Sequence, residues 1–199
     1  MKDYVAFDEV ANALGLEDPT FAEKDYFGVQ LLSLGSRAGN NLYRPVLAGG
    51  TCLAKVYCPT KRMSEDIDLK LVPQAAADGA SKSSRRSACK EIREQIIAAI
   101  ETSGIFTLRN ITSRNESSFQ LLEVDYPRGV PEGVSSLRPY LQLELTESTL
   151  LEPAREASIS SLCAELAGEE PEVQRCQVVT LHSIATEKII SLLRRTADV

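Results

Sequence analysis

Apolar residues recur three or four positions apart in several stretches of the chain, and Ile92, Ile96 and Ile100 are one example. This period places side chains on one face of a helix, so each stretch predicts an amphipathic helix. The predicted helices are Phe7 to Leu14 before Gly15, Thr20 to about Ala38, a brief helix after Thr51, Ala88 to Thr102, Ser158 to Ala167, and Leu181 to Arg195 after the capping residue Thr180.

Short apolar runs and alternating runs predict β-strands. The Pro/Gly-rich connection from Pro127 to Arg138 predicts that the strands on either side of it are hairpin neighbours. The stretch from Pro73 to Ser87 predicts a mobile connection. The predicted strands are Val46 to Ala48, Asp66 to Leu71, Phe106 to Thr112, Phe119 to Tyr126 and Tyr140 to Thr146.

This order of elements indicates an α+β or mixed α/β fold, with a central mixed sheet of about five strands flanked by helices. The length of 199 residues fits one domain, or one and a fraction. We expect residues 1–150 to form the core together with the N-terminal helices. We expect residues 151–199 to begin a helical C-terminal region that is cut short at Val199.

The composition excludes several classes of protein. A formal net charge of -6 does not attract nucleic acid to the whole surface, so an RNA partner would need a local basic patch. Lys82, Arg85 and Arg86 form one such cluster. The single histidine, His182, rules out a two-histidine zinc motif, and we interpret it as structural or solvated.

The cysteines and the apolar runs predict a cytoplasmic protein. The five cysteines are an odd number without a CxxC pair, as expected of buried or half-buried thiols in a reducing compartment. The longest unbroken apolar run, Ile96 to Ile100, is far shorter than the roughly 20 residues of a membrane span. The N-terminus has no signal-peptide pattern.

Two acids in the clearest strand are the main candidates for chemistry. Successive side chains of a strand point to opposite faces, so Asp66 and Asp68 share a face with Lys70. Neighbouring carboxylates are unfavourable unless a cation neutralises them, and Mg²⁺ prefers such oxygen ligands. The alternation alone is equally compatible with the solvated face of an edge strand.

A glycine turn lies a short way before these acids. Gly49, Gly50 and Thr51 follow a predicted strand and precede a helix, where the backbone N–H groups at the helix start favour an anion. A Gly-Gly pair by itself is weak evidence. A Gly-Gly turn that leads through a short helix into an Asp-x-Asp strand is much more specific.

Together these motifs resemble a known family. Leu47 to Tyr57 (LAGGTCLAKVY) and Arg62 to Leu69 (RMSEDIDL) are similar to the signature of the AbiEii-type nucleotidyltransferases. These are toxins of type IV, abortive-infection toxin–antitoxin systems, within the DNA polymerase β-like nucleotidyltransferase superfamily. Glu23 to Tyr26 resembles the opening helix of the family, and Leu181 to Arg195 resembles its lysine-bearing helix. The resemblance implies a nucleotidyltransferase-like fold.

The resemblance also implies roles for matching residues. The glycine turn would hold the triphosphate of a nucleotide, and the acids would bind magnesium, with two ions expected. Ser64 would lie near the phosphates. The residues concerned are Gly49, Gly50, Thr51 and Ser64 for the nucleotide and Asp66 and Asp68 for the metal.

Two further residues complete the expected site. Superfamily members use a third carboxylate from a neighbouring strand, and Glu144 is the best candidate, ahead of Glu123 and Asp125. Lys188 matches the functional lysine of the family, and it interrupts an apolar stripe in the last predicted helix. It would act as a point-charge clamp on phosphate, although a lysine snorkelling at the rim of the core has the same pattern.

Two features depart from the family. Many relatives have a lysine directly before the Gly-Gly pair, where this chain has Ala48. Relatives also continue past the position of Val199 into a helical region that contains a further functional aspartate.

The expected function is therefore metal-dependent transfer of a nucleoside monophosphate from an NTP to a hydroxyl acceptor. The resemblance implies RNA as the acceptor, in particular the 3′ end of tRNA, and a cognate antitoxin as the protein partner. Two alternatives stay open. One is a small-molecule nucleotidyltransferase with the same core motif, and the other is a non-catalytic nucleotide-binding or interaction module with a remnant site.

Overall fold

The computed structural model describes residues 6–58, 64–114, 118–129 and 137–197. Residues 62–63 of the motif and 130–136 of the Pro/Gly-rich connection therefore lie outside the described residues. The helices are α1 (Phe7–Leu14), α2 (Thr20–Ser36), α3 (Gly49–Cys52), α4 (Lys82–Thr102), α5 (Leu162–Ala167) and α6 (Leu181–Ala197), with a π-helical turn η1 (Leu53–Tyr57) and a 3₁₀ turn η2 (Ala75–Ala77).

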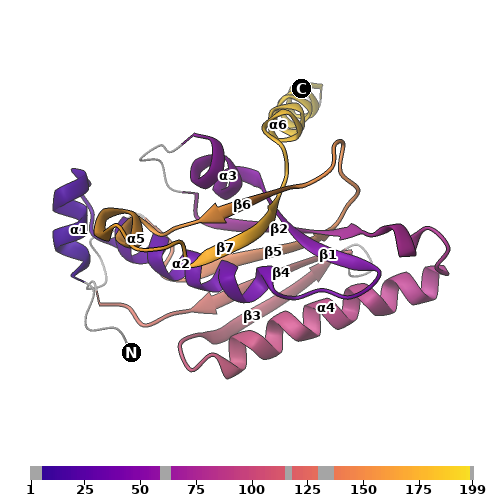
Figure 1. The fold of residues 1–199 in the computed structure, drawn as a ribbon, viewed down its shortest axis with the longest axis horizontal. Coiled ribbons are helices and arrows are strands. Elements are labelled where there is room, and N and C mark those ends of the chain that lie inside the picture. Colours follow the sequence, from indigo (N-terminus) through magenta and orange to yellow (C-terminus); the bar gives the residue numbers. More distant parts are fainter. Residues whose placement is uncertain (1–5, 59–63, 115–117, 130–136, 198–199) are drawn as a thin grey trace.

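One mixed sheet of seven strands forms the centre of the molecule (Figure 1), in the order β3-β4-β5-β2-β1-β7-β6. The neighbours β2 and β5 are parallel, as are β1 and β7, and the other pairs are antiparallel. The strands are β1 (Tyr43–Ala48), β2 (Asp66–Pro73), β3 (Thr107–Arg114), β4 (Phe119–Asp125), β5 (Leu141–Glu147), β6 (Arg155–Ile159) and β7 (Val173–Val178).

Helices α2 and α4 cover one face of the sheet (Figure 1), and the hydrophobic core lies between them and the strands. Ile67, Leu69 and Leu71 of β2 are all buried there. Gly35 of α2 lies so close to the sheet that a Cβ at this position would be 2.8 Å from Leu69 Cδ1. The aliphatic face of β2 is therefore fixed to a rigid layer, which leaves the acidic face for chemistry.

Most of the predicted elements are present. Helix α1 ends at Gly15, which has a positive φ of 64°, and the Ser183 N–H donates to Thr180 Oγ1 (3.1 Å) as expected of the predicted cap of α6. The strands β4 and β5 pair antiparallel, which confirms the predicted hairpin neighbours. The mixed α/β class is confirmed, with a larger sheet than the five strands predicted.

Two predictions were wrong, and two strands were missed. Part of the predicted mobile connection, from Lys82 to Ser87, forms the first turns of α4, because the Ser81 side chain accepts from the Ser84 N–H and caps an earlier start. The predicted helix from Ser158 begins only at Leu162. The strands β6 and β7 were not predicted, because β7 (VQRCQV) lacks a clear alternation and β6 is an exposed edge strand.

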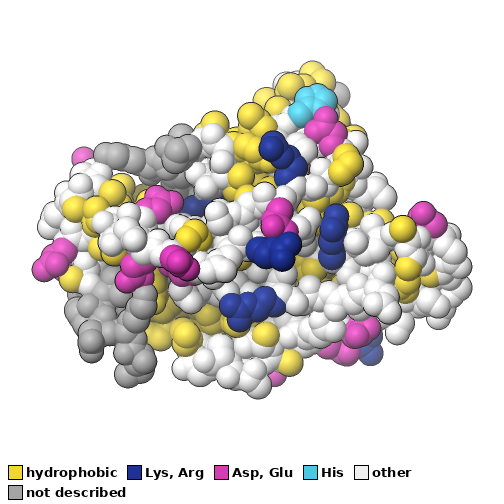
Figure 2. All heavy atoms as spheres, viewed as in Figure 1, with side chains coloured by type: hydrophobic (Ala, Val, Ile, Leu, Met, Phe, Trp, Pro, Cys, Tyr) yellow, Lys and Arg dark blue, Asp and Glu magenta, His cyan; other side chains and the backbone are white. Residues whose placement is uncertain are grey.

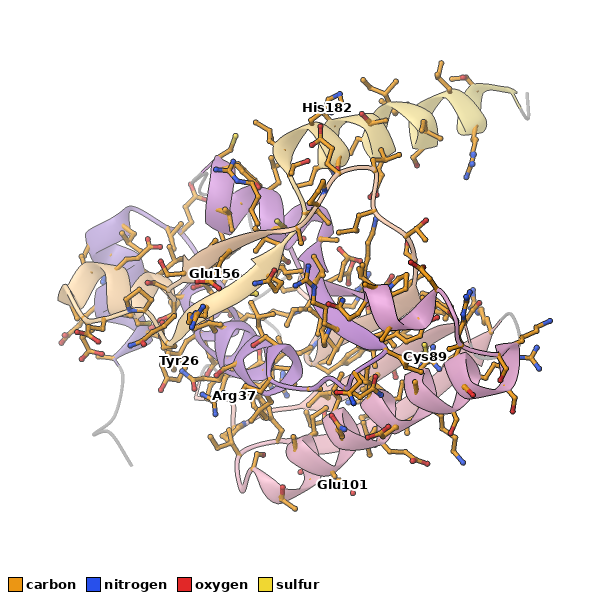
Figure 3. All side chains as sticks on the ribbon, turned by 45° about the vertical axis from the view of Figure 1, so that its right-hand side comes forward. Tyr26, Arg37, Cys89, Glu101, Glu156 and His182 are labelled. Carbon is orange, nitrogen blue, oxygen red and sulfur yellow. The ribbon has the colours of Figure 1, made fainter. Side chains whose placement is uncertain are left out.

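The last helix projects from the body of the molecule. Figures 1 and 3 both show α6 standing clear of the sheet after the connection from β7. Ser183 and Ile184 in its first turn are buried, whereas the described side chains from Lys188 onward are exposed. Among the helices of the described residues, none is long and apolar enough to cross a membrane.

Candidate active site

Three carboxylates lie on the face of the sheet opposite α2 and α4. In β2 the burial alternates, with Asp66 and Asp68 half-buried and the aliphatic residues between them buried. The parallel pairing of β2 with β5 sets Asp68 directly beside Glu144 and Asp66 beside Gln142. Because paired residues in neighbouring strands point to the same face, Glu144 shares the acidic face.

The glycine turn contacts this acidic face. The antiparallel register pairs Ala48 with Asp68, so the next residue, Gly49, lies against the Asp68 side chain. A Cβ at Gly49 would be 1.7 Å from Asp68 Oδ2, and the φ of Gly49 is +66°, a value that side chains rarely adopt. A Cβ at Gly50 would likewise be 2.6 Å from Ser64 Oγ. The structure therefore brings the turn, the serine and the acids together.

Thr51 connects the turn to the acidic strand through its side chain. The hydroxyl donates a 2.6 Å hydrogen bond to the Asp66 carbonyl oxygen. This bond fixes the start of the helix formed by α3 and η1 relative to β2. The hydroxyl proton of Thr51 is therefore donated within the protein. This is expected of a residue that positions the glycine turn.

The electrostatics show that the acids repel one another. Burial, reinforced by the charges of Glu144 and Asp66, raises the pKa of Asp68 to about 6. Burial and the charge of Asp66 also raise the pKa of Glu144. Lys70 and Lys188 favour the ionised form of Asp68 but do not outweigh these effects. A bound cation would remove this repulsion.

Helix α6 brings Lys188 toward the acids. The ion pair between Lys70 of β2 and Glu187 of α6 fixes the first half of the helix over the acidic face. Lys188 follows Glu187 and lies close enough to Asp68 to lower its pKa. The side chain of Lys188 is exposed, as is Leu192 one turn later. Lys188 is therefore on the surface beside the site rather than at the rim of a packed core.

The structure adds charged residues that sequence reasoning missed. The Lys24 ammonium lies 2.6 Å from Glu65 Oε1 and also donates to the Arg138 carbonyl oxygen at 2.9 Å. Lys24 is fully buried, and burial lowers its pKa while the hydrogen bond to Glu65 opposes the shift. The Arg138 guanidinium in turn lies 2.7 Å from Asp66 Oδ1.

Helix α2 holds the elements around the site through two adjacent charges. Besides the bonds of Lys24, the Asp25 carboxylate pairs with Lys55 of η1 at 2.5 Å and accepts from the Leu162 N–H at 2.7 Å. Both residues belong to the Glu23 to Tyr26 segment that resembles the opening helix of the family. In the sequence, the resemblance of this segment to the family was the available signal for these charges. It did not indicate the residues with which Lys24 and Asp25 pair.

The remaining candidates lie apart from the acids. His182 is exposed and pairs with Glu152 (2.9 Å), in agreement with a solvated role (Figure 3). Asp125 pairs with Arg109 (3.1 Å). Glu123 lies opposite Gln142 on the same face as Asp66, one strand further out.

The basic cluster lies beyond the opposite end of β2 from Asp66. Lys82, Arg85 and Arg86 are all in the first turns of α4, which follows β2 and η2. Arg85 Nε donates to the Ala77 carbonyl oxygen at 3.0 Å, so this side chain stabilises the turn before the helix. A direct part in the acidic site is not supported by this location.

A cavity of about 200 Å³ lies behind the glycine turn. Its wall is largely apolar and comes from α1, α2 and α5, with Lys24, Thr51, Ser64 and Glu65 on the side of the turn. Asp66, Asp68 and Glu144 do not line it. The cavity therefore lies among the elements that support the glycine turn, and the three acids face the other side.

The donor set suits a hard divalent cation. Within the described residues, no group of three or more histidine, cysteine, aspartate or glutamate side chains is close enough to hold a metal ion. Two carboxylates, Asp66 and Asp68, are sufficient for Mg²⁺ when substrate phosphates and water supply the other ligands. Asp66 and Asp68 repel each other, and the Arg138 guanidinium already lies beside Asp66. Both observations indicate a position that favours a positive charge.

Comparisons with known proteins agree with this geometry. No curated protein matches the chain. A protein-family model described as "Nucleotidyl transferase AbiEii toxin, Type IV TA system" matches residues 36–198, which is most of the chain and includes the glycine turn, the acidic strand and α6. The chain belongs to the family of AbiEii nucleotidyl transferase toxins of type IV toxin–antitoxin systems.

Proposed function

We propose that this nucleotidyltransferase moves a nucleoside monophosphate from an NTP to a hydroxyl group of an acceptor, with the reaction centred on β2. One observation carries the proposal: Asp68 occupies the place where Gly49 would have a side chain. The turn suited to phosphates therefore contacts a carboxylate suited to a cation. Nucleotidyl transfer needs these two groups side by side.

Each residue of the site has a role in this reaction. Asp66 and Asp68, with Glu144 beside them, would hold Mg²⁺, which neutralises phosphate charge and lowers the pKa of a bound hydroxyl. The backbone N–H groups of Gly49 and Gly50 would bind the triphosphate, with Ser64 beside them. Lys188 would stabilise the negative charge on the departing pyrophosphate.

The raised pKa of Glu144 also has a use in the reaction. A carboxylate whose pKa lies above its ordinary value is a stronger base and accepts a proton more readily. Glu144 would take the proton of the attacking hydroxyl at one of its Oε atoms. It lies directly beside Asp68 in the sheet, so the proton would be removed next to the cation site.

We propose RNA, in particular the 3′ end of tRNA, as the acceptor, and a cognate antitoxin as the protein partner. This part of the proposal rests on membership of the toxin family. The net charge of -6 requires that RNA be held at local basic groups. Arg85→Glu tests the contribution of the α4 cluster to RNA binding.

The decisive experiment follows label from each α-³²P-NTP to tRNA in the presence of Mg²⁺. We expect labelled tRNA with the natural chain, no label with Asp66→Ala plus Asp68→Ala, and full activity with Asp78→Ala, which removes an exposed aspartate from the turn after η2. Transfer that survives the double substitution would refute the assigned site.

The same transfer assay, together with calorimetry, separates the alternatives. Label found only on small hydroxylated acceptors would identify a small-molecule nucleotidyltransferase. Calorimetric binding of Mg-NTP without transfer to any acceptor would identify a remnant site.

A further inference from the structure

The Arg138 guanidinium already forms an ion pair with Asp66, one of the proposed metal ligands. Arg138 Nη1 lies 2.7 Å from Asp66 Oδ1 and also donates to Gln142 Oε1. Gln142 is the residue paired with Asp66 across β2 and β5, so Arg138 spans the two strands that carry the acids. The guanidinium and the Asp66 carboxylate are each about two-fifths exposed, at 43% and 40%.

The position of this arginine is set by the ion pair between Lys24 and Glu65. Glu65 Oε1 accepts from the Arg138 N–H at 2.9 Å, and the Lys24 ammonium donates to the Arg138 carbonyl oxygen at 2.9 Å. Lys24 is fully buried in α2. Both backbone groups of Arg138 are thus fixed, so its side chain starts from a fixed point beside Asp66 instead of from a free loop.

We propose that Arg138 is a positioning residue that holds the Asp66 carboxylate in place before a divalent cation binds, and that it leaves this carboxylate when the cation arrives. Two cations on one carboxylate repel each other, so guanidinium and Mg²⁺ compete for Asp66. This inference rests on the proposed function, because that function brings the cation to Asp66.

The competition has a measurable size. A partly exposed Arg–Asp pair contributes roughly 0.2–1 kcal/mol, and the upper end of this range corresponds to about a fivefold change in an equilibrium constant. We therefore expect Arg138→Gln to tighten Mg²⁺ binding by about threefold to fivefold, measured by calorimetric titration of the full chain with MgCl₂. Arg109→Gln, which removes an exposed arginine paired with Asp125 on β4, leaves the affinity unchanged.

A double-substitution cycle separates displacement from a general effect of charge. If Arg138 acts by occupying Asp66, Arg138→Gln has no effect on Mg²⁺ affinity in an Asp66→Asn background. If the effect arises only from the removal of a nearby positive charge, it persists there because Asp68 and Glu144 remain. Persistence in the Asp66→Asn background overturns the proposal, as does unchanged or weaker binding by Arg138→Gln.

A spectroscopic signal follows the arginine directly. In a protein labelled with ¹⁵N-arginine, the Nε–Hε signal of Arg138 is identified by its absence in Arg138→Lys. We expect this signal to shift as MgCl₂ is added, while that of Arg109 stays in place. An Arg138 signal that stays in place while Mg²⁺ saturates the protein overturns the inference, and so does the absence of any Mg²⁺ binding.

Neither measurement uses a nucleotide or an acceptor. A protein that shows the competition but transfers no label would keep this inference and lose the proposed function. A protein that transfers label without the competition would do the opposite.

Discussion

At the scale of single residues, Gly49 leaves less room for a side chain than the other glycines whose surroundings the structure describes. Its positive φ and the 1.7 Å that would separate a Cβ from Asp68 Oδ2 both exclude a side chain. We expect Gly49→Ala to displace the carboxylate and lower nucleotidyl transfer by roughly a hundredfold, the size of effect known for a misplaced reactive group. Initial rates of label transfer measure this.

Gly79→Ala is the matched control, because nothing lies within 4 Å of a Cβ there. We expect normal activity from it. Equal activity of the two alanine variants would show that the turn does not position Asp68.

Asp68 also predicts a dependence of stability on pH. Its pKa is raised from 3.8 to about 6 by burial and by Glu144 and Asp66, against Lys70 and Lys188. Above pH 6 the folded protein must keep this carboxylate ionised at a cost, and the cost disappears as the pH falls from 6 toward 4. We expect Asp68→Asn to raise the Tm at pH 8 and to lose most of that advantage by pH 4.

Thermal unfolding in EDTA across this range measures the effect. Saturating Mg²⁺ should reverse the sign of the Tm difference between Asp68→Asn and the natural protein at pH 8, since the natural protein then gains a bound cation. A Tm difference independent of pH in EDTA would contradict the raised pKa.

Local patterns predicted the residues of the site better than its supports. The alternation in β2 was enough to place Asp66 and Asp68 on one face, because strand geometry is a local property. Arg138 could not be found in this way. Its place beside Asp66 depends on Glu65 and on a lysine 114 residues away in the chain.

At the scale of elements, α2 supports the site through its buried charge. Lys24 is 0% exposed and bonds to Glu65 and to Arg138. Removal of the ammonium takes one donor from the partly exposed Glu65 and one from the Arg138 carbonyl oxygen, so we expect Lys24→Met to lower the free energy of unfolding by about 1–2 kcal/mol. Urea denaturation measures it. Lys90→Met, which removes an exposed pair with Glu94, should cost less than about 0.5 kcal/mol.

Helix α6 makes the opposite contribution, to function more than to stability. Lys188 is exposed, and its charge acts on Asp68. We expect Lys188→Ala to lower kcat at least tenfold with a change in Tm below 1 °C. Arg194→Ala, an exposed cation further along the same helix, should match the natural protein in both. A large fall in Tm for Lys188→Ala would instead indicate a structural role.

Elements with strong periodicity were predictable, and weakly patterned ones were not. The helices α1 and α4 and the strands β2 and β5 have regular burial patterns and were found, although α4 begins six residues before the predicted start. The edge strand β6 is largely exposed and β7 alternates poorly. They become strands only by pairing with each other and with β1, which is a long-range event.

At the scale of the whole molecule, the second half of α6 adds exposed apolar side chains to the surface. Ile189, Leu192 and Leu193 are each 58–63% exposed on a helix that projects from the body, and Figure 2 shows apolar side chains gathered at this end. Exposed apolar clusters of this kind bind hydrophobic dyes. We expect Leu192→Gln plus Leu193→Gln to lower 8-anilinonaphthalene-1-sulfonate fluorescence by at least half without altering the Tm.

Ile111, an isolated exposed isoleucine of β3, provides the control for that measurement. Ile111→Gln should leave the fluorescence nearly unchanged. Dye binding that falls equally in both variants would show that α6 has no special apolar surface.

The charged residues of α2 have a consequence for the order in which the chain folds. Lys24 and Asp25 are synthesised early, but Glu65, Arg138 and Leu162 follow 41, 114 and 137 residues after the groups they pair with. Contacts of such long sequence separation form late. A nascent chain on the ribosome would therefore hold an incomplete centre at least until residue 162 has emerged, so α2 waits for most of its partners long after it has itself been synthesised.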